Sequence, residues 1–217
     1  MKKILVLIFS GLFFFSTAQA DMGINVGLSG QIGAFEASAT ETEDSEKSRE
    51  DDAMAAFGYA SVFLEKDLGD FITIGVDYVP SALASESTEE LRTDLLGKAD
   101  GAASSVTQKV QVDFEDLTTF YLALNLNENF YIKAGVSSVD VITNEKLGTG
   151  STYGNASMDG SVMAAGYNKS LDSGLFVRAE GSYMTFDAIT INGSGDTKVT
   201  ADEINGASAK ISIGKSF

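Results

Sequence analysis

The sequence contains no cysteine, no histidine, no tryptophan and a single proline, Pro80. Without cysteine, the chain forms neither disulfide bonds nor thiolate metal sites. Without histidine, it lacks the usual general base of enzymes and the commonest ligand of transition metals. A chain with one proline is free to build long β-ladders, because proline cannot donate a hydrogen bond to a ladder.

Long hydrophobic runs are also scarce, and the clearest one begins the chain. Lys2 and Lys3 precede an apolar stretch over residues 4–15, and residues 18–20 read Ala-Gln-Ala. A positive start, an apolar middle and an A-x-A site are typical of a secretory signal peptide. We therefore expect residues 1–20 to be a cleaved signal peptide, with a retained N-terminal anchor as the alternative.

Basic residues are few in what remains. Without Lys2 and Lys3, 13 basic residues stand against 31 acidic ones, a net charge of −18. Such a chain is repelled by nucleic acid, so we expect no nucleic-acid partner. No later apolar run approaches the roughly 18 residues of a spanning helix. Residues 21–217 fit one domain of ordinary size, for which we expect no cofactor.

Apolar and polar residues alternate along most of the chain, which is the pattern of half-buried β-strands. In residues 106–126, for example, Phe120, Leu122 and Leu124 share one parity, whereas the other parity is mostly polar. A helix repeats every 3.6 residues and does not produce this pattern. We expect an all-β protein with eight strands, near residues 23–36, 54–66, 71–81, 106–126, 130–143, 157–170, 175–191 and 206–217.

Short and long connections alternate between these strands. The three short ones, over residues 67–70, 127–129 and 171–174, contain the Gly, Asn and Asp of hairpin turns. An up-and-down meander then puts every short turn at one end and every long loop at the other. The four long connections span residues 38–53, 82–105, 144–156 and 192–205.

Two of the long connections have sequences that allow a more specific expectation. The first, over residues 38–53, is dense in charge and has no apolar period, so we expect a mobile loop. In the second, Ser87 and Glu90 have the spacing of a capping box, and Gly97 is suited to end a helix. A short helix in this loop is therefore an option.

Alternation alone does not reveal whether the apolar face points inward or outward. The polar faces are rich in small residues, which suit a narrow interior, and the strands exceed the mean of about 5–6 residues. Aromatic residues gather in two rows, as in the interfacial girdles of membrane barrels. The rows are Phe63, Phe71, Phe130, Tyr131, Phe176 and Phe217 near the short turns, and Phe35, Tyr78, Phe114, Tyr183 and Phe186 further along.

These observations predict an eight-stranded antiparallel up-and-down transmembrane β-barrel, with short periplasmic turns and four long extracellular loops. A secreted soluble barrel that binds a ligand inside remains the alternative. In the predicted barrel the even number of strands puts both termini at the short-turn end, which is periplasmic in a bacterial outer membrane.

The last stretch, NGASAKISIGKSF, carries a resemblance to the small outer-membrane barrels of Gram-negative bacteria, the OmpA-like, OmpX-like, OmpW-like and opacity-type group. In those families the last strand ends in Phe after apolar residues at alternate positions, and the barrel assembly machinery reads this pattern. Phe217, Ile213 and Ile211 match it, whereas Lys215 stands where the family has an apolar residue. The resemblance implies a monomer in the outer membrane, in contact with its lipid and lipopolysaccharide.

The chemistry available to a site is limited. Enzymes among the outer-membrane barrels depend on a histidine, which this chain lacks, so we expect no enzymatic activity. Charged residues of the polar faces can pair inside a narrow barrel, because a buried charge requires a partner. Such a cluster either plugs the interior or lines a narrow path. The predicted cluster consists of Asp77, Asp113, Glu115, Lys133, Arg178, Glu180 and Lys210.

The first long loop is the remaining candidate site. Clusters of oxygen ligands suit Ca²⁺ or Mg²⁺, but the spacing of a dedicated calcium loop is missing, so no specific metal site is predicted. We expect a solvated acidic tip, with a weak contact to divalent cations as the sharper alternative. The acidic residues are Glu41, Glu43, Asp44, Glu46, Asp51 and Asp52.

The sequence thus supports three hypotheses. The first is a non-enzymatic barrel that stabilises the envelope and contacts an unknown surface ligand through its loops. The second is a narrow porin-like channel for ions or small solutes. The third is the secreted soluble barrel.

The terminal pattern yields a first prediction. Deletion of Phe217 should strongly impair insertion into the outer membrane, whereas Lys215→Tyr should leave insertion intact or improve it. Cell fractionation and the heat-modifiable mobility of the folded barrel on gels measure both. Unchanged insertion without Phe217 would show that this residue is not part of an assembly signal.

Overall fold

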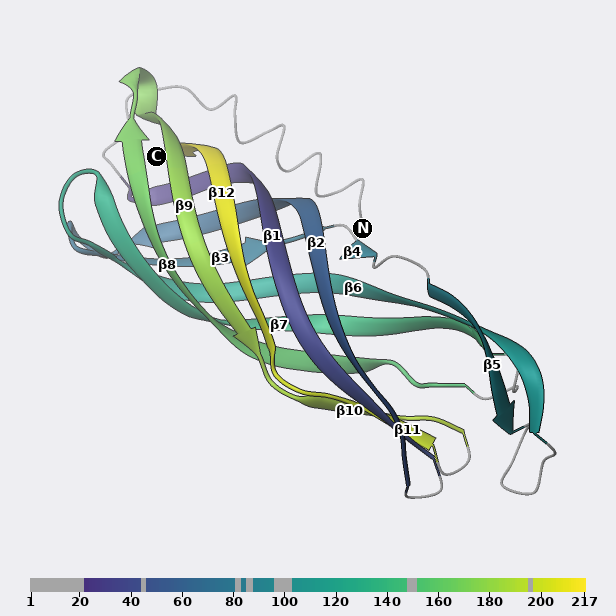
Figure 1. Cartoon of the computed structure of the whole chain (residues 1–217). Coiled ribbons are helices and arrows are strands. Elements are labelled where there is room, and N and C mark those ends of the chain that lie inside the picture. The colour runs from purple at the N-terminus through teal and green to yellow at the C-terminus, as the bar shows by residue number, and fades with distance from the viewer. Residues whose placement is uncertain are drawn as a thin grey trace.

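The structure is a computed structural model that describes residues 22–43, 46–80, 83–84, 88–95, 103–147, 152–194 and 197–217. Its long antiparallel strands wrap into a tilted barrel, and the C-terminus lies at the end where the short turns are (Figure 1). In this part of the chain no helix is both long and apolar enough to cross a membrane. The expected signal peptide, residues 1–20, lies outside the described residues.

Among the described residues, eight long strands close the barrel, as the sequence predicted. Each pairs antiparallel with its neighbours in the order β1-β12-β9-β8-β7-β6-β3-β2, and β2 returns to β1. Backbone bonds between Ile24 and Phe217 join the first and last strands. The strands are β1 (Ile24–Glu43), β2 (Glu46–Asp67), β3 (Ile72–Tyr78), β6 (Ala103–Asn125), β7 (Phe130–Leu147), β8 (Ala156–Ser170), β9 (Leu175–Phe186) and β12 (Ile204–Ser216).

Shorter elements occupy the expected long loops. β4 (Leu83–Ala84) and β5 (Thr88–Leu95) run along β6, so the helix considered for this segment is wrong. β10 (Ile189–Asn192) and β11 (Thr197–Ala201) continue the ladder beside β1. A single 3₁₀ turn, η1 (Asp172–Gly174), is one of the short connections.

The first long connection is also not a loop in most of its length. β1 and β2 remain paired from Ile24–Lys66 to Glu43–Glu46, so the expectation of a mobile segment over residues 38–53 is wrong for its described part. β1 alone has 20 residues, about 65 Å at 3.3 Å per residue, whereas a bilayer crossing takes about 9–11 residues. The long-loop end of the barrel therefore extends well beyond a membrane.

The outer face carries the apolar residues, as predicted for a membrane barrel. On β1, Leu28 and Ile32 are exposed and Ser29 is buried, and on β12 Ile211 and Ile213 are exposed while Ser212 is buried. Exposed apolar side chains of this kind occur on every one of the eight long strands and form a belt around the barrel. A contiguous apolar surface of this extent requires lipid, because water disfavours it.

The aromatic girdles are only partly where the sequence put them. Phe71, Phe130 and Tyr183 are exposed on the belt, and the rings of Phe130 and Tyr167 meet edge to face at 5.1 Å between centroids. Six aromatic residues expected in the girdles instead point into the barrel. They are Phe35, Phe63, Phe114, Tyr131, Phe176 and Phe186.

Glycines explain why these rings fit inside. Phe63 lies over Gly27, its partner on the neighbouring strand, and a Cβ on that glycine would overlap the ring. Gly214 seats Phe176 in the same way. The pairs Tyr121–Gly75, Tyr131–Gly166, Phe35–Gly206 and Phe186–Gly160 repeat this arrangement. Each glycine frees the volume that one inward ring fills, as in the aromatic rescue of strand glycines.

A β-bulge in β6 corrects another expectation. The pairing of β6 with β7 shifts between Glu115 and Thr118, and Asp116 has a φ of 54°. The extra residue exchanges the faces of β6 on its two sides. Phe114 therefore packs against the interior, and Asp113 and Glu115, predicted to face the interior, lie on the outer face.

Because the inward rings pack against glycines, two substitutions in β1 should differ in their effect on the free energy of unfolding. Gly27→Val should lower the free energy of unfolding by about 1–3 kcal/mol, because the new side chain overpacks the interior against Phe63. Gly30→Val, on the lipid face with nothing near its Cβ position, should leave it unchanged or raise it. Urea unfolding in lipid vesicles, followed by heat-modifiable mobility, measures both. Equal effects would show that the ring does not depend on the glycine.

Candidate functional site

The interior is arranged in layers, beginning with an open cavity at the short-turn end. This cavity has a volume of about 930 Å³, and its lining includes Asn25, Asn125 and Asn129 near the mouth. Its deepest lining residues are Glu65 and Arg178. The cavity is open and lined largely by polar groups, so water has access to the barrel down to this depth.

The first closed layer is an ion pair surrounded by rings. Both terminal nitrogens of Arg178 donate to Glu65, at 2.6 and 3.0 Å, and the Tyr121 hydroxyl donates to the same carboxylate at 2.8 Å. The guanidinium carbon lies 5.1 Å from the ring centre of Phe176 and 5.4 Å from that of Phe63. A bidentate pair flanked by aromatic faces is a geometry that suits arginine in a buried ion pair.

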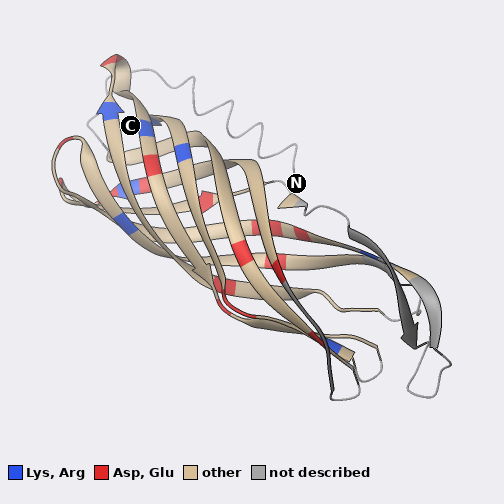
Figure 2. Ribbon diagram, in the orientation of Figure 1, with Lys and Arg blue, Asp and Glu red and all other residues tan. Residues whose placement is uncertain are grey.

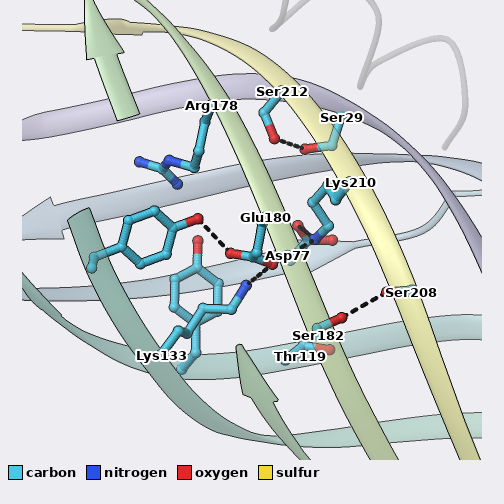
Figure 3. Close-up of polar contacts among 12 residues, drawn as sticks. Ser29, Asp77, Thr119, Lys133, Arg178, Glu180, Ser182, Ser208, Lys210 and Ser212 are labelled. Atoms are coloured by element: carbon cyan, nitrogen blue, oxygen red, sulfur yellow. Dashed lines mark hydrogen bonds and ion pairs between the residues drawn. The ribbon is translucent and has the colours of Figure 1, made fainter. Parts of the chain in front are cut away.

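The next layer contains two lysines and two carboxylates (Figure 3). Lys133 donates to Glu180 at 2.6 Å, and Lys210 donates to Asp77 at 2.8 Å and lies 3.9 Å from Glu180. The hydroxyl of Tyr131 also donates to Glu180, at 2.6 Å. With Arg178 and Glu65, three cations thus meet three anions. Their charges cancel inside the barrel, as buried charges require.

Five of the seven residues predicted for the cluster lie in these two layers. They are Asp77, Lys133, Arg178, Glu180 and Lys210. Asp113 and Glu115 are absent, because the bulge turns them outward. Glu65 is the member that the sequence missed. Both parities of β2 carry apolar residues, so its inward face was ambiguous.

Hydroxyl pairs connect the strands around the charged layers. Ser29 and Ser212 lie 2.8 Å apart, Thr119 and Ser137 2.8 Å, and Ser182 and Ser208 2.6 Å. The first and third of these pairs are drawn in Figure 3. Each pair satisfies two inward polar groups without a charge.

Above the charges, the interior becomes apolar, which the sequence did not predict. A void of about 20 Å³ among Tyr59, Asp77 and Glu180 is just large enough for one water. Beyond it, towards the long loops, lies the apolar cluster. Its buried members are Tyr59, Val79, Leu117, Val139, Val141, Met158, Val162, Met184 and Phe186.

Among the described residues, one edge of β2 lacks a ladder partner beside this apolar cluster. β3 pairs with β2 only over Val62–Asp67, and from residue 46 to residue 61 the only described partner of β2 is β1. β3 ends at Tyr78, just before Val79 and the sole proline, Pro80. The chain then follows β6 instead of β2, since the Val79 amide donates to Leu117 at 3.0 Å.

Side chains close the wall where the described backbone forms no ladder. Phe57 of β2 faces Phe114 of β6, with ring centres 6.1 Å apart, and Leu83 packs against the same cluster. Outside, Ala56 and Gly58 are exposed, and Gly58 is next to Ile32 of the belt. The edge of β2 that has no partner among the described residues therefore lies at the height of the lipid.

The other predicted site residues lie outside the barrel interior. Ile211, Ile213 and Phe217 share the outer face of β12, where Phe217 bonds to Ile24. Their role in assembly stays a prediction.

The acidic residues of the first connection lie on the extended β1–β2 hairpin. Glu41 accepts from Tyr153 at 2.9 Å, and Asp52 accepts from Ser38 at 2.6 Å. Glu43, Glu46 and Asp51 lie on the strands, and Asp44 lies outside the described residues. Strand alternation puts Glu41 and Asp52 on opposite faces. No group of three potential metal ligands occurs in the described part of the chain.

Comparison with known proteins identifies the fold. No family model matches the sequence. No curated protein matches it either. Among solved structures, outer membrane protein OprG of Pseudomonas aeruginosa is similar over 91% of this chain and 97% of its own, with a TM-score of 0.54 and 13% identity. The outer membrane protease OmpT of Escherichia coli covers 92% of this chain and 99% of its own, with a TM-score of 0.46 and 8% identity.

The predicted resemblance to outer-membrane barrels is thus confirmed at the level of the fold. The exposed apolar belt is the surface that such a barrel presents to lipid.

The charged layers yield a prediction that separates the interior from the outer face. Glu180→Gln should lower the free energy of unfolding by about 3 kcal/mol, because it leaves Lys133 without its buried partner. Glu115→Gln, outside the barrel beyond the bulge, should change it little. Urea unfolding of both variants in the same vesicles is the measurement. An equal loss in the two variants would contradict the bulge or the charge layer.

Proposed function

We propose that the protein is a non-enzymatic outer-membrane barrel that passes small apolar solutes from its long-loop end sideways into the lipid, through the wall beside Pro80. The observation that carries this proposal is the contact between the apolar cluster and the edge of β2 that has no ladder partner in the described part of the chain. Unpaired backbone next to lipid is costly unless it is covered or lines a cavity. Here Phe57, Phe114 and Leu83 cover it, and side chains move far more readily than a hydrogen-bonded ladder.

The chemistry of the interior favours an apolar solute over an ion. A solute that enters from the long loops meets Met158, Met184 and Phe186, and none of these offers a polar group to an ion. Methionine fills irregular space and adapts to different apolar shapes. At the bottom of this cluster, the paired charges oppose further passage. Sideways exit avoids them, because the gap in the wall lies on the apolar side of the charged layers.

A path for ions along the axis has less support. The cavity of about 930 Å³ and the void of about 20 Å³ share no lining residue. Between them lie Arg178, Glu65 and the seated rings. Side chains fill barrels of eight strands in this way. The charged cluster therefore supports the plug rather than the porin-like channel.

A non-enzymatic role is supported by the lack of histidine and by the ion pairs of the buried carboxylates. The chain has no histidine, and the buried carboxylates Glu65, Asp77 and Glu180 are all engaged in ion pairs. A general base must be within reach of a substrate proton. These carboxylates face their own lysines and arginine instead.

The long β1–β2 hairpin favours a second candidate, a role in surface contacts. It extends beyond the belt with Glu41 and Asp52 on opposite faces, so each face of the hairpin carries a carboxylate.

Both candidate functions assume the same position of the protein in the outer membrane. We propose short turns and termini in the periplasm, a monomer in contact with outer-membrane lipid and lipopolysaccharide, and insertion by the barrel assembly machinery.

Uptake of a small apolar dye by bacterial cells tests the sideways path. Cells that express the protein should take up 1-N-phenylnaphthylamine several-fold faster than cells without it. Phe57→Ala should raise the rate further, because the ring that closes the gap is lost. Phe120→Ala is the matched control, since Phe120 is exposed on the lipid face of β6.

Two results would contradict the proposal. One is uptake by cells with the folded protein no faster than by cells without it, shown alongside heat-modifiable mobility of the barrel. The other is a steady ion conductance of the purified protein in planar bilayers, which would favour an axial pore.

A further inference from the structure

Basic residues are unevenly distributed over this acidic protein. Figure 2 shows that lysine and arginine gather on the barrel strands towards the end where the C-terminus lies. Three of the basic residues there, Lys133, Arg178 and Lys210, are the buried partners of the charged layers. Three others, Lys66, Lys169 and Lys215, occupy outward-facing positions of their strands, and Lys66 also reaches the mouth of the cavity.

The three outer lysines occupy equivalent places. Each is the penultimate residue of its strand, Lys66 in β2, Lys169 in β8 and Lys215 in β12. Each also comes two positions after an exposed apolar residue on the same face. These residues are Leu64, Tyr167 and Ile213. The lysines thus mark the edge of the apolar belt at the short-turn end.

The lysines are regularly spaced around the wall. β1 separates β2 from β12, and β9 separates β12 from β8. Lys66 and Lys215 are therefore about two strand spacings apart, as are Lys215 and Lys169, which is about 10 Å in each case. This spacing is comparable to that of neighbouring lipid headgroups.

None of the three forms an ion pair with a carboxylate of the described residues. Lys66 donates to the backbone carbonyl of Met22, and the ammonium of Lys215 lies 5.2 Å from the ring centre of Phe217. An aromatic ring beside a lysine at a membrane boundary orients the ammonium towards the headgroups while the stem stays in the apolar region. In a chain of net charge −16, three cations without acidic partners call for an external anion.

We propose that Lys66, Lys169 and Lys215 form a binding row for the phosphate groups of anionic phospholipids in the membrane leaflet at the short-turn end. The three ammonium groups supply charge at headgroup height, and the belt above them takes the acyl chains. The row accounts for Lys215, which departs from the apolar pattern of the last strand. It depends on insertion in a membrane, but not on the passage of solutes.

The lipids that the purified protein retains measure the binding of anionic phospholipids directly. The mature chain is refolded in nanodiscs of equal parts phosphatidylglycerol and phosphatidylcholine, and the lipids that remain bound after detergent exchange are quantified by mass spectrometry. We expect enrichment of phosphatidylglycerol, falling about five-fold for each lysine changed to glutamine, which corresponds to about 1 kcal/mol per cation. High salt should reduce the enrichment in the same direction.

Two further variants make the result decisive. Lys198→Gln removes the same charge from an exposed position on β11, at the long-loop end, and should leave the enrichment unchanged. The triple change of Lys66, Lys169 and Lys215 to arginine should preserve it. The proposal fails if the triple glutamine variant, folded by heat-modifiable mobility, keeps the wild-type enrichment. It also fails if Lys198→Gln lowers the enrichment as much as Lys66→Gln does.

Discussion

In hydrocarbon, no water is available to bond an exposed backbone N–H or C=O group, so each must find a partner within the protein. Closure of β1 on both β2 and β12 meets this requirement for nearly the whole wall, down to the bonds between Ile24 and Phe217. In the part of the chain that the structure describes, one edge of β2 from residue 46 to residue 61 departs from it. Pro80 follows β3 where the ladder stops, and proline has no N–H to continue it. Because backbone without a partner is costly at the height of the lipid, an edge of this kind suggests a functional role.

Closure with eight strands leaves a narrow interior, and the packing there follows from the size of the residues. A ring fits only where the neighbouring strand supplies a glycine, as with Phe63 on Gly27 and Phe176 on Gly214. These two rings in turn pack against Arg178, which forms the ion pair with Glu65 at the bottom of the cavity. Glycine, aromatic ring and ion pair therefore depend on one another. The layer stabilises the barrel and separates the water-filled mouth from the apolar half of the interior.

Much of the barrel could be predicted because its cause is local. Alternation with a period of 2 identifies strands, and Gly, Asn and Asp identify the short turns. The luminal positions of Lys133 and Glu180 followed from parity alone, since their strands are regular. Parity failed in β6, where one additional residue near Asp116 exchanges the two faces and turns Asp113 and Glu115 outward. It also failed for the inward rings, because an aromatic residue suits a lipid interface and a glycine-lined interior equally well.

The sequence by itself determined the strand architecture, the outward apolar face and the lack of a histidine-dependent site. These properties depend on residue type and on spacing within a few positions. The tertiary structure decided which distant residues meet. Arg178 and Glu65 are 113 positions apart, and Lys210 and Asp77 are 133 apart. Such partners are fixed by strand order and register around the closed barrel. The apolar upper interior, and the edge of β2 left without a partner among the described strands, likewise arise only once the strands have closed on one another.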